Sequence, residues 1–579
     1  MSSHRNKTII FMPDVQTLNH NETKAIAVKT IVLRLAIPVI LLAVSSIALA
    51  HDVVDSSTLT GKVICGYQGW FTCPGDGSPP GTGWSHWGRD EGNSIKRFTV
   101  EMWPDLREFD PDELFLAEGV KLTNGKPGYL FSSVHPKTVA RHFKWMKDTD
   151  IDGVFLQRFI NEVRSKSDRF VIRNKVLENV RTAANIHGRV FAVEYDCNGG
   201  NARTLFEDLT RDWKYLVDKL QITKDPRYLH HNGKPVVIIW GLGFDSPTRK
   251  FSPTLCYRIV DFFKNDLLYG GNFCIGGVPT GWRTLTRDSR SDLGWIKVYR
   301  SWDAIHPWTV GRYTSLDEVN RHKTEYWEPD IHETKSLGID YLPVVWPGFS
   351  WDNLKRLPHG DSLKPRLGGR FLWSQIHAAR SAGAEMLFVA MFDEVDEATA
   401  IFKVADEHPV TGHWITYQGL PHDWYMRLAG AAGRMLKGEI PLTSTFPINP
   451  HCNGDEVSFN LGEDHADRIT HPRLDDGRTK SITVKNALCR RNLDPHKDRY
   501  MYFAVDDRFV FQGNQSRLVI TVDYYDVGDG ELHLQYDSDT GDGLSAVYRL
   551  AGSIGLTGTE TWKRRLFPLT DAWFGNRQN

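Results

Sequence analysis

The sequence contains few cysteines, no excess of charge of either sign and no apolar run long enough to cross a membrane. Its 579 residues include 7 cysteines, 70 Lys and Arg and 71 Asp and Glu, which gives a formal net charge of -1. The cysteines are too scattered for a disulfide scaffold and lack the CxxC spacing of a zinc site. A net charge near zero provides no long-range field for nucleic acid or an anionic membrane. We therefore expect no nucleic-acid partner, and a neutral or locally recognised ligand.

The first 50 residues have the pattern of a signal peptide or an N-terminal anchor. After basic residues up to Arg34, an apolar run covers residues 35–49 and ends in Ala48-Leu49-Ala50, which is the order found in a secretory signal. The run is shorter than the roughly 20 residues that a spanning helix needs. We predict a secreted, periplasmic or cell-surface protein, with stable membrane contact only if this segment is retained. After export, Cys65 and Cys73 could form a disulfide.

Aromatic residues are what the sequence has in excess. It contains 19 Trp, 19 Tyr and 29 Phe, or 12% of the chain. Flat apolar rings with polar edges suit the C–H faces of sugars. Most single rings in a protein of this size fill its cores, but the excess as a whole favours binding of a poly- or oligosaccharide.

From residue 62 onward, short apolar runs alternate with longer stretches of helical periodicity. The predicted strands are 63–68, 153–157, 189–195, 235–240, 273–278, 303–306, 341–346 and 386–392. The predicted helices include 136–147, 172–186, 204–220, 316–337, 368–382 and 424–435. Strands that are apolar on both faces suit a parallel sheet, and eight such units in one sheet predict an α/β fold, a (β/α)8 TIM barrel over residues 51–440.

The rival fold for this pattern is a doubly wound open sheet. No GxGxxG motif follows the first strand, as a dinucleotide-binding sheet would have. A long insertion, residues 71–134, follows that strand instead, and we expect it to close over the mouth of a barrel.

Beyond residue 441 the pattern changes to short alternating runs separated by Gly and Asp turns. Residues 500–505, 516–524 and 532–536 indicate antiparallel strands, and we predict a separate β-sandwich domain over 441–579, with a role in carbohydrate binding. Its aspartates fit no EF-hand spacing, so solvated turns are favoured over a Ca²⁺ site. They are Asp523, Asp526, Asp529, Asp537, Asp539 and Asp542.

The most informative segment follows the eighth predicted strand, where Asp393-Glu394-Val395-Asp396-Glu397 places four carboxylates at the expected barrel mouth. Hydrolysis of a glycosidic bond needs one carboxyl group as acid and a second as base or nucleophile. Glu394 and Glu397, three residues apart, would share one side of a helical turn. The structural alternative is Asp393 as a helix N-cap, with acids favoured by the helix dipole. The position at the end of strand eight favours catalysis.

The segment also resembles a known family. Phe392 to Ile401, FDEVDEATAI, is similar to the catalytic segment of family 99 glycoside hydrolases, the endo-alpha-mannosidases, and of the wider 71/99-like group. Further matches are Gly66 to Phe71 (GYQGWF), Trp84 to Trp87 (WSHW) and Ile151 to Val154 (IDGV). The resemblance covers about residues 62–438.

The resemblance implies a retaining glycosidase. Glu394 would remove the proton of the substrate's 2-hydroxyl to form a 1,2-anhydro sugar, and Glu397 would be the acid and then the base that activates water. From residue chemistry alone, covalent catalysis by a carboxylate remains equally open. Between the glutamates the mannosidases carry Trp-His where this chain has Val395-Asp396. The alternative is therefore a non-catalytic carbohydrate-binding protein on a glycosidase fold.

Stacking rings and hydrogen-bonding groups near the strand ends are the candidate substrate contacts. They are Trp70, His86, Trp87, Gln157, Arg158, Tyr195, Asp196, Trp240, His306, Trp346 and Asp393, with Trp308 beside them. Glu194 is the third-ranked carboxylate, and His306 has an equal claim to a structural role. No cofactor or metal is expected, although His86, His306, Asp303 and Asp196 could be drawn as a metal site. We expect a monomer.

Overall fold

The computed structural model divides the chain into two compact units. One is Ser45–Pro447, and the other combines Met1–Val44 with Ile448–Asn579. The described residues are 9–13, 27–35, 53–91, 94–164, 167–448, 456–462, 465–467, 469–472, 476–494, 497–505, 509–510, 516–540 and 543–575.

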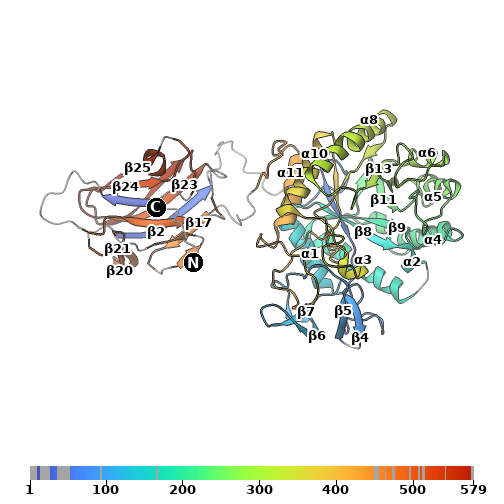
Figure 1. The fold of residues 1–579 in the computed structure, drawn as a ribbon, viewed down its shortest axis with the longest axis horizontal. Helices are drawn as coiled ribbons and strands as arrows, with labels where there is room; N and C mark the ends of the chain where they lie inside the picture. The colour runs from blue at the N-terminus through green and yellow to red at the C-terminus, as the bar shows by residue number, and fades with distance from the viewer. Residues whose placement is uncertain are drawn as a thin grey trace. The chain divides into compact units, whose positions relative to one another are not determined.

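The larger unit is built on a parallel sheet (Figure 1). Its strands are β3 (Val63–Tyr67), β8 (Gly153–Phe159), β9 (Val190–Asp196), β11 (Lys234–Trp240), β12 (Phe273–Pro279), β13 (Ala304–Trp308), β14 (Asp340–Tyr341), β15 (Val344–Val345) and β16 (Leu387–Val389). They follow the order β14-β13-β12-β11-β9-β8-β3-β16-β15. Only residues 342 and 343 separate β14 from β15, so the two edges of the sheet meet in one short segment. The result is the TIM-like barrel that the alternating pattern predicts.

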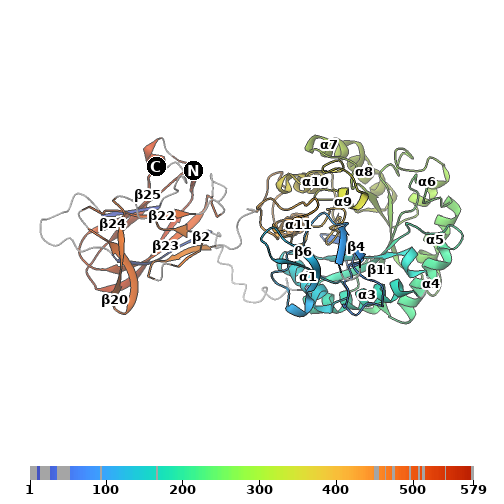
Figure 2. The ribbon, with the colours of Figure 1, turned by 60° about the horizontal axis from the view of Figure 1, so that its bottom comes forward.

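Helices cover the outside of these strands (Figures 1 and 2). They are α1 (Pro136–Asp148), α3 (Asp168–His187), α4 (Leu205–Asp218), α5 (Pro253–Asn265), α6 (Gly294–Tyr299), α7 (Leu316–His322), α8 (Glu328–Leu337), α10 (Arg370–Ser381) and α11 (Trp424–Leu436). The single helix predicted for 316–337 is interrupted between α7 and α8 by a π-helical segment, Lys323–Trp327. Pro329 follows this segment, and its missing N–H removes one bond of a regular helical ladder.

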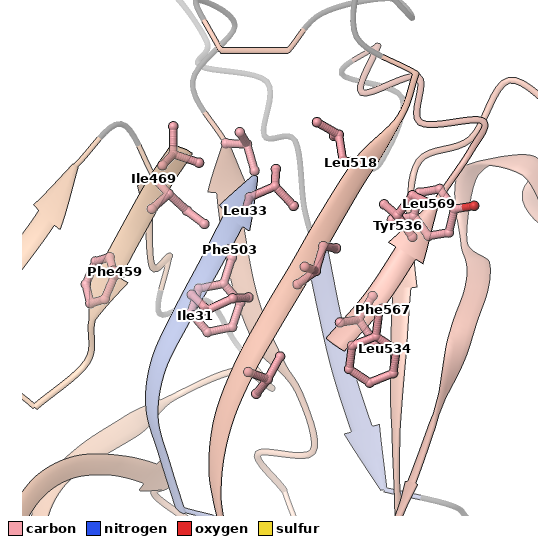
Figure 3. Packing of buried hydrophobic residues seen from close by; sticks show 14 of the residues in the cluster. Ile31, Leu33, Phe459, Ile469, Phe503, Leu518, Leu534, Tyr536, Phe567 and Leu569 are labelled. Atoms are coloured by element: carbon pink, nitrogen blue, oxygen red, sulfur yellow. The ribbon is translucent and has the colours of Figure 1, made fainter. Parts of the chain in front are cut away.

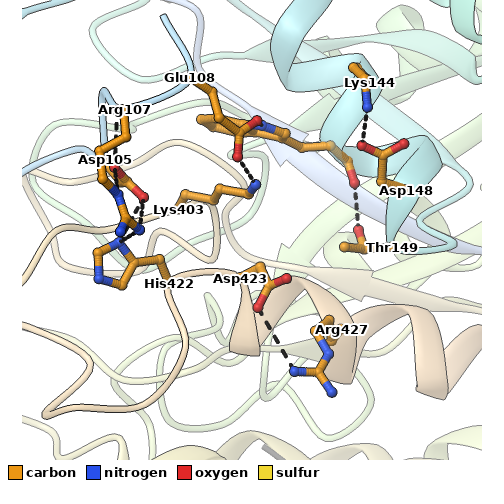
Figure 4. Close-up of polar contacts among 11 residues, drawn as sticks. Asp105, Arg107, Glu108, Lys144, Asp148, Thr149, Lys403, His422, Asp423 and Arg427 are labelled. Atoms are coloured by element: carbon orange, nitrogen blue, oxygen red, sulfur yellow. Dashed lines mark hydrogen bonds and ion pairs between the residues drawn. The ribbon is translucent and has the colours of Figure 1, made fainter. Parts of the chain in front are cut away.

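The insertion after the first strand forms a small sheet of its own. Its strands are β4 (Gly88–Glu91), β5 (Ser94–Phe98), β6 (Phe115–Lys121) and β7 (Pro127–Leu130). Figure 4 shows how the insertion is tied to the chain beyond β16. The Asp105 amide donates to the Lys403 carbonyl over 2.9 Å, and the Glu108 carboxylate pairs with Lys403 Nζ and accepts from Trp145 Nε1 over 2.7 Å. The insertion is thereby fixed against the segment that carries the glutamates.

The smaller unit contains two antiparallel sheets. One has the order β19 (Ile469–Thr470), β22 (Met501–Val505), β1 (Ile9–Pro13), β24 (Glu531–Tyr536) and β25 (Arg549–Gly555). The other contains β18 (His465–Asp467), β17 (Glu456–Asn460), β2 (Ala27–Leu35), β21 (Ala487–Asn492), β20 (Thr479–Val484), β23 (Leu518–Asp526) and β26 (Thr561–Leu569). Buried residues from both sheets form one core, part of which is seen in Figure 3.

Two strands of this unit come from the segment assigned above to a signal or anchor. Within β2, Ile31 and Leu33 are completely buried, and Ile31 pairs with Val522 of β23. Ile31 and Leu33 are two residues apart, so both side chains lie on the core face of the strand. The apolar run itself, apart from Leu35, lies outside the described residues, so export stays a prediction. Among the helices described, none is long and apolar enough to span a membrane.

Local contacts also bear on two further expectations, the disulfide between Cys65 and Cys73 and the aspartate-rich region of the smaller unit. Cys65 and Cys73 are both buried free thiols, and the Cys73 Sγ donates to the Phe131 carbonyl over 3.1 Å, so the proposed disulfide is absent. In the aspartate-rich region, Asp526 accepts hydrogen bonds from Thr557 and Thr559 and pairs with Lys563 over 2.7 Å. That carboxylate is thus bound by protein groups, whereas Asp542 lies outside the described residues.

Candidate active site

A cavity of about 740 Å³ lies at the carboxyl ends of the barrel strands. In barrels of this kind the functional residues are found at that end. The wall includes Gln68 and Trp70 after β3, Gln157 and Phe159 of β8, Glu194 and Asp196 of β9, Trp240 of β11, Trp308 of β13, and Glu394 and Glu397 after β16.

Glu394 and Glu397 line this cavity together. Glu394 is buried and Glu397 half-buried. The expected helical turn is wrong, because the residues after β16 form an irregular turn in which the amides of Thr399 and Ala400 donate to the Glu394 carbonyl over 3.1 and 2.9 Å. The two carboxylates nevertheless reach the same space, as the spacing of three residues predicted.

The two carboxyl groups resist ionisation. Burial, followed by the charges of Glu397 and Asp396, raises the pKa of Glu394 well above its ordinary value. Burial and then Asp396 raise the pKa of Glu397 to about 7, although Lys355 opposes the shift. Because each charge disfavours the other, the pair retains a proton near neutral pH. One group is then available as an acid while the other acts as a base.

Asp393 has a structural position instead of the predicted sugar contact or helix cap. Its carboxylate accepts the amides of Gln68 and Gly69 over 2.7 and 2.9 Å, which joins the end of β16 to the end of β3. Gly69 has a φ of 56°, a conformation that side chains with a Cβ rarely adopt. Burial raises the pKa of Asp393 to about 7.

The turn that carries the glutamates is supported from the insertion. The Glu101 amide donates to the Val395 carbonyl over 2.7 Å, and the Ser350 amide donates to the Glu397 carbonyl over 3.0 Å. The Glu101 carboxylate accepts from the Asn353 amide over 2.5 Å and from Ser350 Oγ over 3.2 Å. Within the part of the insertion that the structure describes, no residue lines the cavity. The insertion therefore backs the turn and does not roof the cavity as expected.

Trp70 is held by stacking on both sides. Its ring lies 3.9 Å from the His86 ring at an angle of 6°, and 5.3 Å from the Phe159 ring. His86 Nδ1 lies 3.3 Å from the Asp396 carboxylate. Burial and then the charge of Arg173 lower the pKa of His86 to about 3, so the imidazole is neutral. His86 thus orients Trp70 and Asp396 from behind the cavity wall.

Two further acidic residues, Glu194 and Asp196 of β9, lie on the cavity wall. Burial and then Asp196 raise the pKa of Glu194 to about 8, and burial raises the pKa of Asp196 to about 6. Of the predicted contacts, Trp70, Gln157, Asp196, Trp240 and Trp308 line the cavity, as does Glu194. Glu194 points into the barrel, which the strand pattern left open.

Arg158 and Tyr195 lie on the other face of the same strands. Side chains alternate along a strand, so the neighbours of Gln157, Glu194 and Asp196 face the helix layer. There Arg158 and Tyr195 both bind Asp212 of α4, over 2.6 and 2.7 Å. They form a buried structural cluster and make no contact with the cavity.

Three other predicted contacts are also structural. His306 is buried in the barrel, where its Nδ1 lies 3.0 Å from the Leu342 carbonyl. Trp346 packs against Phe371 of α10. Trp87 stacks on Phe71 within the insertion, and its Nε1 donates to Phe131 over 3.0 Å. None of the three residues lines the cavity.

Several cavity residues were not predicted. They are Gln68, Phe159, Asn198, Phe244, Arg249, Val310, Gly311, Arg312, Phe349, Trp351, Leu357, Asp361, Ser362, Lys364 and Met391. Gln68 lies inside the motif Gly66 to Phe71 (GYQGWF), so the family resemblance was a signal that could have predicted it as a substrate contact. Those from Phe244 to Lys364 lie in loops whose course no periodicity predicts.

The described residues contain no group of three or more His, Cys, Asp and Glu that could hold a metal ion. The set drawn from His86, His306, Asp303 and Asp196 is not assembled. Asp303 precedes β13 and binds the Cys274 amide and Lys264, each over 2.9 Å, at the opposite end of the strand from the cavity.

No family model matches this chain, and no curated protein matches it. Among solved structures it is similar to the GH99 endo-alpha-mannosidase from Bacteroides thetaiotaomicron, with 16% identity over 66% of this chain and 99% of that chain and a TM-score of 0.48. A glycoside hydrolase-like protein matches with 14% identity over 59% of this chain and 97% of that chain, at a TM-score of 0.38. GH5_18 from Streptomyces cattleya, in complex with GlcNAc, matches with 11% identity over 53% of this chain and 76% of that chain, at a TM-score of 0.34. The solved structures thus include the family that the sequence motifs resemble.

Proposed function

We propose that this chain is a glycoside hydrolase that cleaves a poly- or oligosaccharide with Glu394 and Glu397. The observation that carries the proposal is the convergence of these two carboxyl groups on one cavity at the end of β16. Their raised pKa values favour a shared proton, which general acid and base catalysis at one glycosidic bond requires.

Aromatic side chains around the pair support a sugar as substrate. Trp70, Trp240, Trp308 and Trp351 line the same cavity, and rings of this kind stack on pyranose faces. Polar groups among them, such as Gln157, can hydrogen-bond hydroxyls. We infer that the substrate is a glycan with an alpha or related linkage, as the family resemblance implies.

In the retaining mechanism that the resemblance implies, Glu394 takes the proton of the 2-hydroxyl and that oxygen attacks the anomeric carbon. Glu397 protonates the leaving oxygen, and later removes a proton from the water that opens the 1,2-anhydro sugar, while Glu394 returns its proton to the 2-oxygen. The half-buried position of Glu397 leaves it open to water for this second step. Burial, followed by the charges of Glu397 and Asp396, raises the pKa of Glu394.

The N-terminal segment and the smaller unit complete the proposal. We propose export of the protein, and a carbohydrate-binding role for the smaller unit as a β-sandwich. Loss of polymer binding, with retained hydrolysis of short substrates, is expected on disrupting the smaller unit. Unchanged affinity for polymers would contradict that role.

The test is release of reducing ends from a panel of plant, algal and microbial polysaccharides. We expect Glu394→Gln and Glu397→Gln to lower the rate by about three orders of magnitude, since each removes an essential proton transfer. Glu385→Gln is the matched control, because Glu385 is exposed at the opposite end of the same strand. Equal activity in all three variants would contradict the proposed catalytic roles of Glu394 and Glu397.

The panel also tests the alternative. Binding of a glycan by the wild-type chain without cleavage of any bound glycan would favour a non-catalytic binding protein. The feature that motivates this alternative is Val395-Asp396, where the mannosidases carry Trp-His.

A further inference from the structure

Three basic side chains lie on the cavity wall. Arg249, Arg312 and Lys364 line the cavity together with Glu394 and Glu397. Arg249 follows β11, the fourth strand position from β3, whereas the glutamates follow β16, the eighth position when β14 and β15 are counted as one. The fourth and eighth positions of an eight-stranded barrel lie across from one another. A ligand that spans the cavity therefore meets Glu394 and Glu397 on one side and, on the other, the Arg249 guanidinium with Asp196 of the neighbouring strand β9.

Arg249 has unused binding capacity. Its guanidinium carbon lies 4.6 Å from the Trp240 ring centre and 5.1 Å from that of Phe244, so the group is held flat against the aromatic wall. Within the described ranges its Nε is buried with no hydrogen-bond partner, and no carboxylate forms an ion pair with it. A buried donor without an acceptor is costly unless a ligand supplies one.

Arg312 continues the basic surface into a neighbouring hollow. It pairs with Asp288 over 2.8 Å while remaining about one-third exposed, with a relative accessibility of 34%. It also lines a second hollow of about 320 Å³, together with Arg287 and Arg321. Glu318 of that hollow already accepts two hydrogen bonds from Thr314, of 2.6 and 2.9 Å. The basic groups thus extend beyond the main cavity.

We propose that the substrate is an anionic polysaccharide, whose sulfate or carboxylate groups are bound by Arg249, across the cavity from Glu394 and Glu397, and by Arg312 after β13. This inference rests on the proposed hydrolase function and adds the substrate class. The planar guanidinium group presents paired N–H donors that match sulfate and carboxylate oxygens.

The position of Arg249 opposite the two glutamates fits such a substrate. An anion beside Glu394 and Glu397 would oppose the ionisation that catalysis needs, whereas one beside Arg249 and Arg312 is attracted. With a formal net charge of only -1 on the whole chain, recognition of a polyanion has to be local. Binding through these arginines is therefore expected to weaken as salt rises.

The experiment compares three polymers with one backbone: dextran, carboxymethyl dextran and dextran sulfate. Affinity is measured by retardation in native gels, with the full chain carrying Glu397→Gln so that cleavage does not interfere. We expect a charged dextran to bind more tightly than neutral dextran, and the preferred charged form distinguishes carboxylate from sulfate recognition.

The decisive variants are Arg249→Gln and Arg312→Gln, each added to that background. Each should weaken binding of the preferred charged dextran by about tenfold, since a charge-assisted hydrogen bond is lost. Arg258→Gln is the matched control, because Arg258 also stacks on a ring, at 3.5 Å from Phe206, but lies outside the cavity. It removes the same overall charge and should bind like its parent. Circular dichroism melting verifies that each variant is folded.

Three outcomes overturn the proposal: no preference for a charged dextran, equal binding by the Arg258 and Arg249 variants, and retention of full binding by the Arg312 variant. Hydrolysis of neutral glycans that needs Glu397, without any such preference, would retain the hydrolase and reject the anionic substrate. Binding of charged dextran through Arg249, with no glycan hydrolysed by the wild-type chain, would retain the anion site and reject the hydrolase.

Discussion

The larger and smaller units both bury carboxylates, but they surround them differently. In the smaller unit Asp526 is fully buried and accepts from Thr557 and Thr559 and from Lys563 Nζ at 2.7 Å. Burial alone would raise its pKa, yet the hydrogen bonds of Lys563 and Thr559 hold it below the ordinary value. At the barrel mouth Glu394 accepts from Thr399 Oγ1 over 3.2 Å, and no cation within the described part of the chain pairs with it.

This difference separates carboxylates that stabilise the fold from those available for chemistry. A buried acid with a cation and several donors contributes stability as an anion. A buried acid among other acids holds its proton and can transfer it. Both kinds occur within the barrel as well, since Asp212 is paired with Arg158 while Glu397 lies near Asp396.

The largest effect is expected where a buried pair is broken. Asp212→Ala leaves Arg158 as an unpaired buried cation, because both side chains are fully buried, and should lower the free energy of unfolding by about 3–5 kcal/mol. Urea unfolding followed by tryptophan fluorescence measures this change. Asp218→Ala, on the exposed part of the same helix, serves as the control. A loss in the Asp212 variant no larger than in the control would contradict this account of the pair.

A smaller loss is expected from the paired acid of the smaller unit. Asp526→Ala leaves Lys563 and two threonines without their acceptor and should cost about 2–3 kcal/mol. Because the folded pKa is depressed, this contribution is present above the unfolded pKa of about 4 and is lost as pH falls below it. Calorimetric melting at neutral pH and at pH below about 4 measures it. The hydrolysis proposed for the barrel should not change. An Asp526→Ala variant as stable as the wild type at neutral pH would contradict the stabilising role of Asp526.

The unpaired acids should show the opposite pH dependence. The folded pKa of Glu397 is raised to about 7, so the folded state binds a proton that the unfolded state releases at about 4.3. As pH rises from about 4.3 to about 7 the barrel should therefore lose stability, and Glu397→Gln should flatten this decline. Calorimetric melting across this range measures the slope, with Glu385→Gln retaining the wild-type slope. If the stability of the Glu397→Gln and Glu385→Gln variants declined with pH in parallel, the result would contradict the raised pKa of Glu397.

The smallest effect is expected from an exposed pair on the barrel surface. Lys144 and Asp148 form an ion pair of 2.5 Å on α1, and both are about half exposed (Figure 4). Lys144→Gln should cost less than about 0.5 kcal/mol. Glu108→Gln, by contrast, weakens the contacts to Lys403 and Trp145 and should cost about 1 kcal/mol. Equal losses in urea unfolding would show that exposure does not distinguish the two pairs.

Much of the barrel could be predicted because its strands are locally encoded. Runs such as 235–240 are apolar on both faces, and β11 occupies Lys234–Trp240. The site was predictable where it adjoins a strand end: Gln157, Asp196, Trp240 and the two glutamates all line the cavity. Arg158 and Tyr195 were misplaced because composition alone does not say which side of a strand faces the barrel, and a shift of one residue reverses the assignment.

The sequence by itself determined the alternating strands and helices, and the spacing that puts two glutamates at the end of β16, since both depend on short-range periodicity. Only the tertiary structure decided that β2 lies beside β23, that the insertion supports the turn that carries Glu394 and Glu397, and that Arg249 and Arg312 face the same cavity. Each of these brings together groups far apart in the chain, and such pairings are selected by shared burial and complementary hydrogen bonding, which no local pattern records.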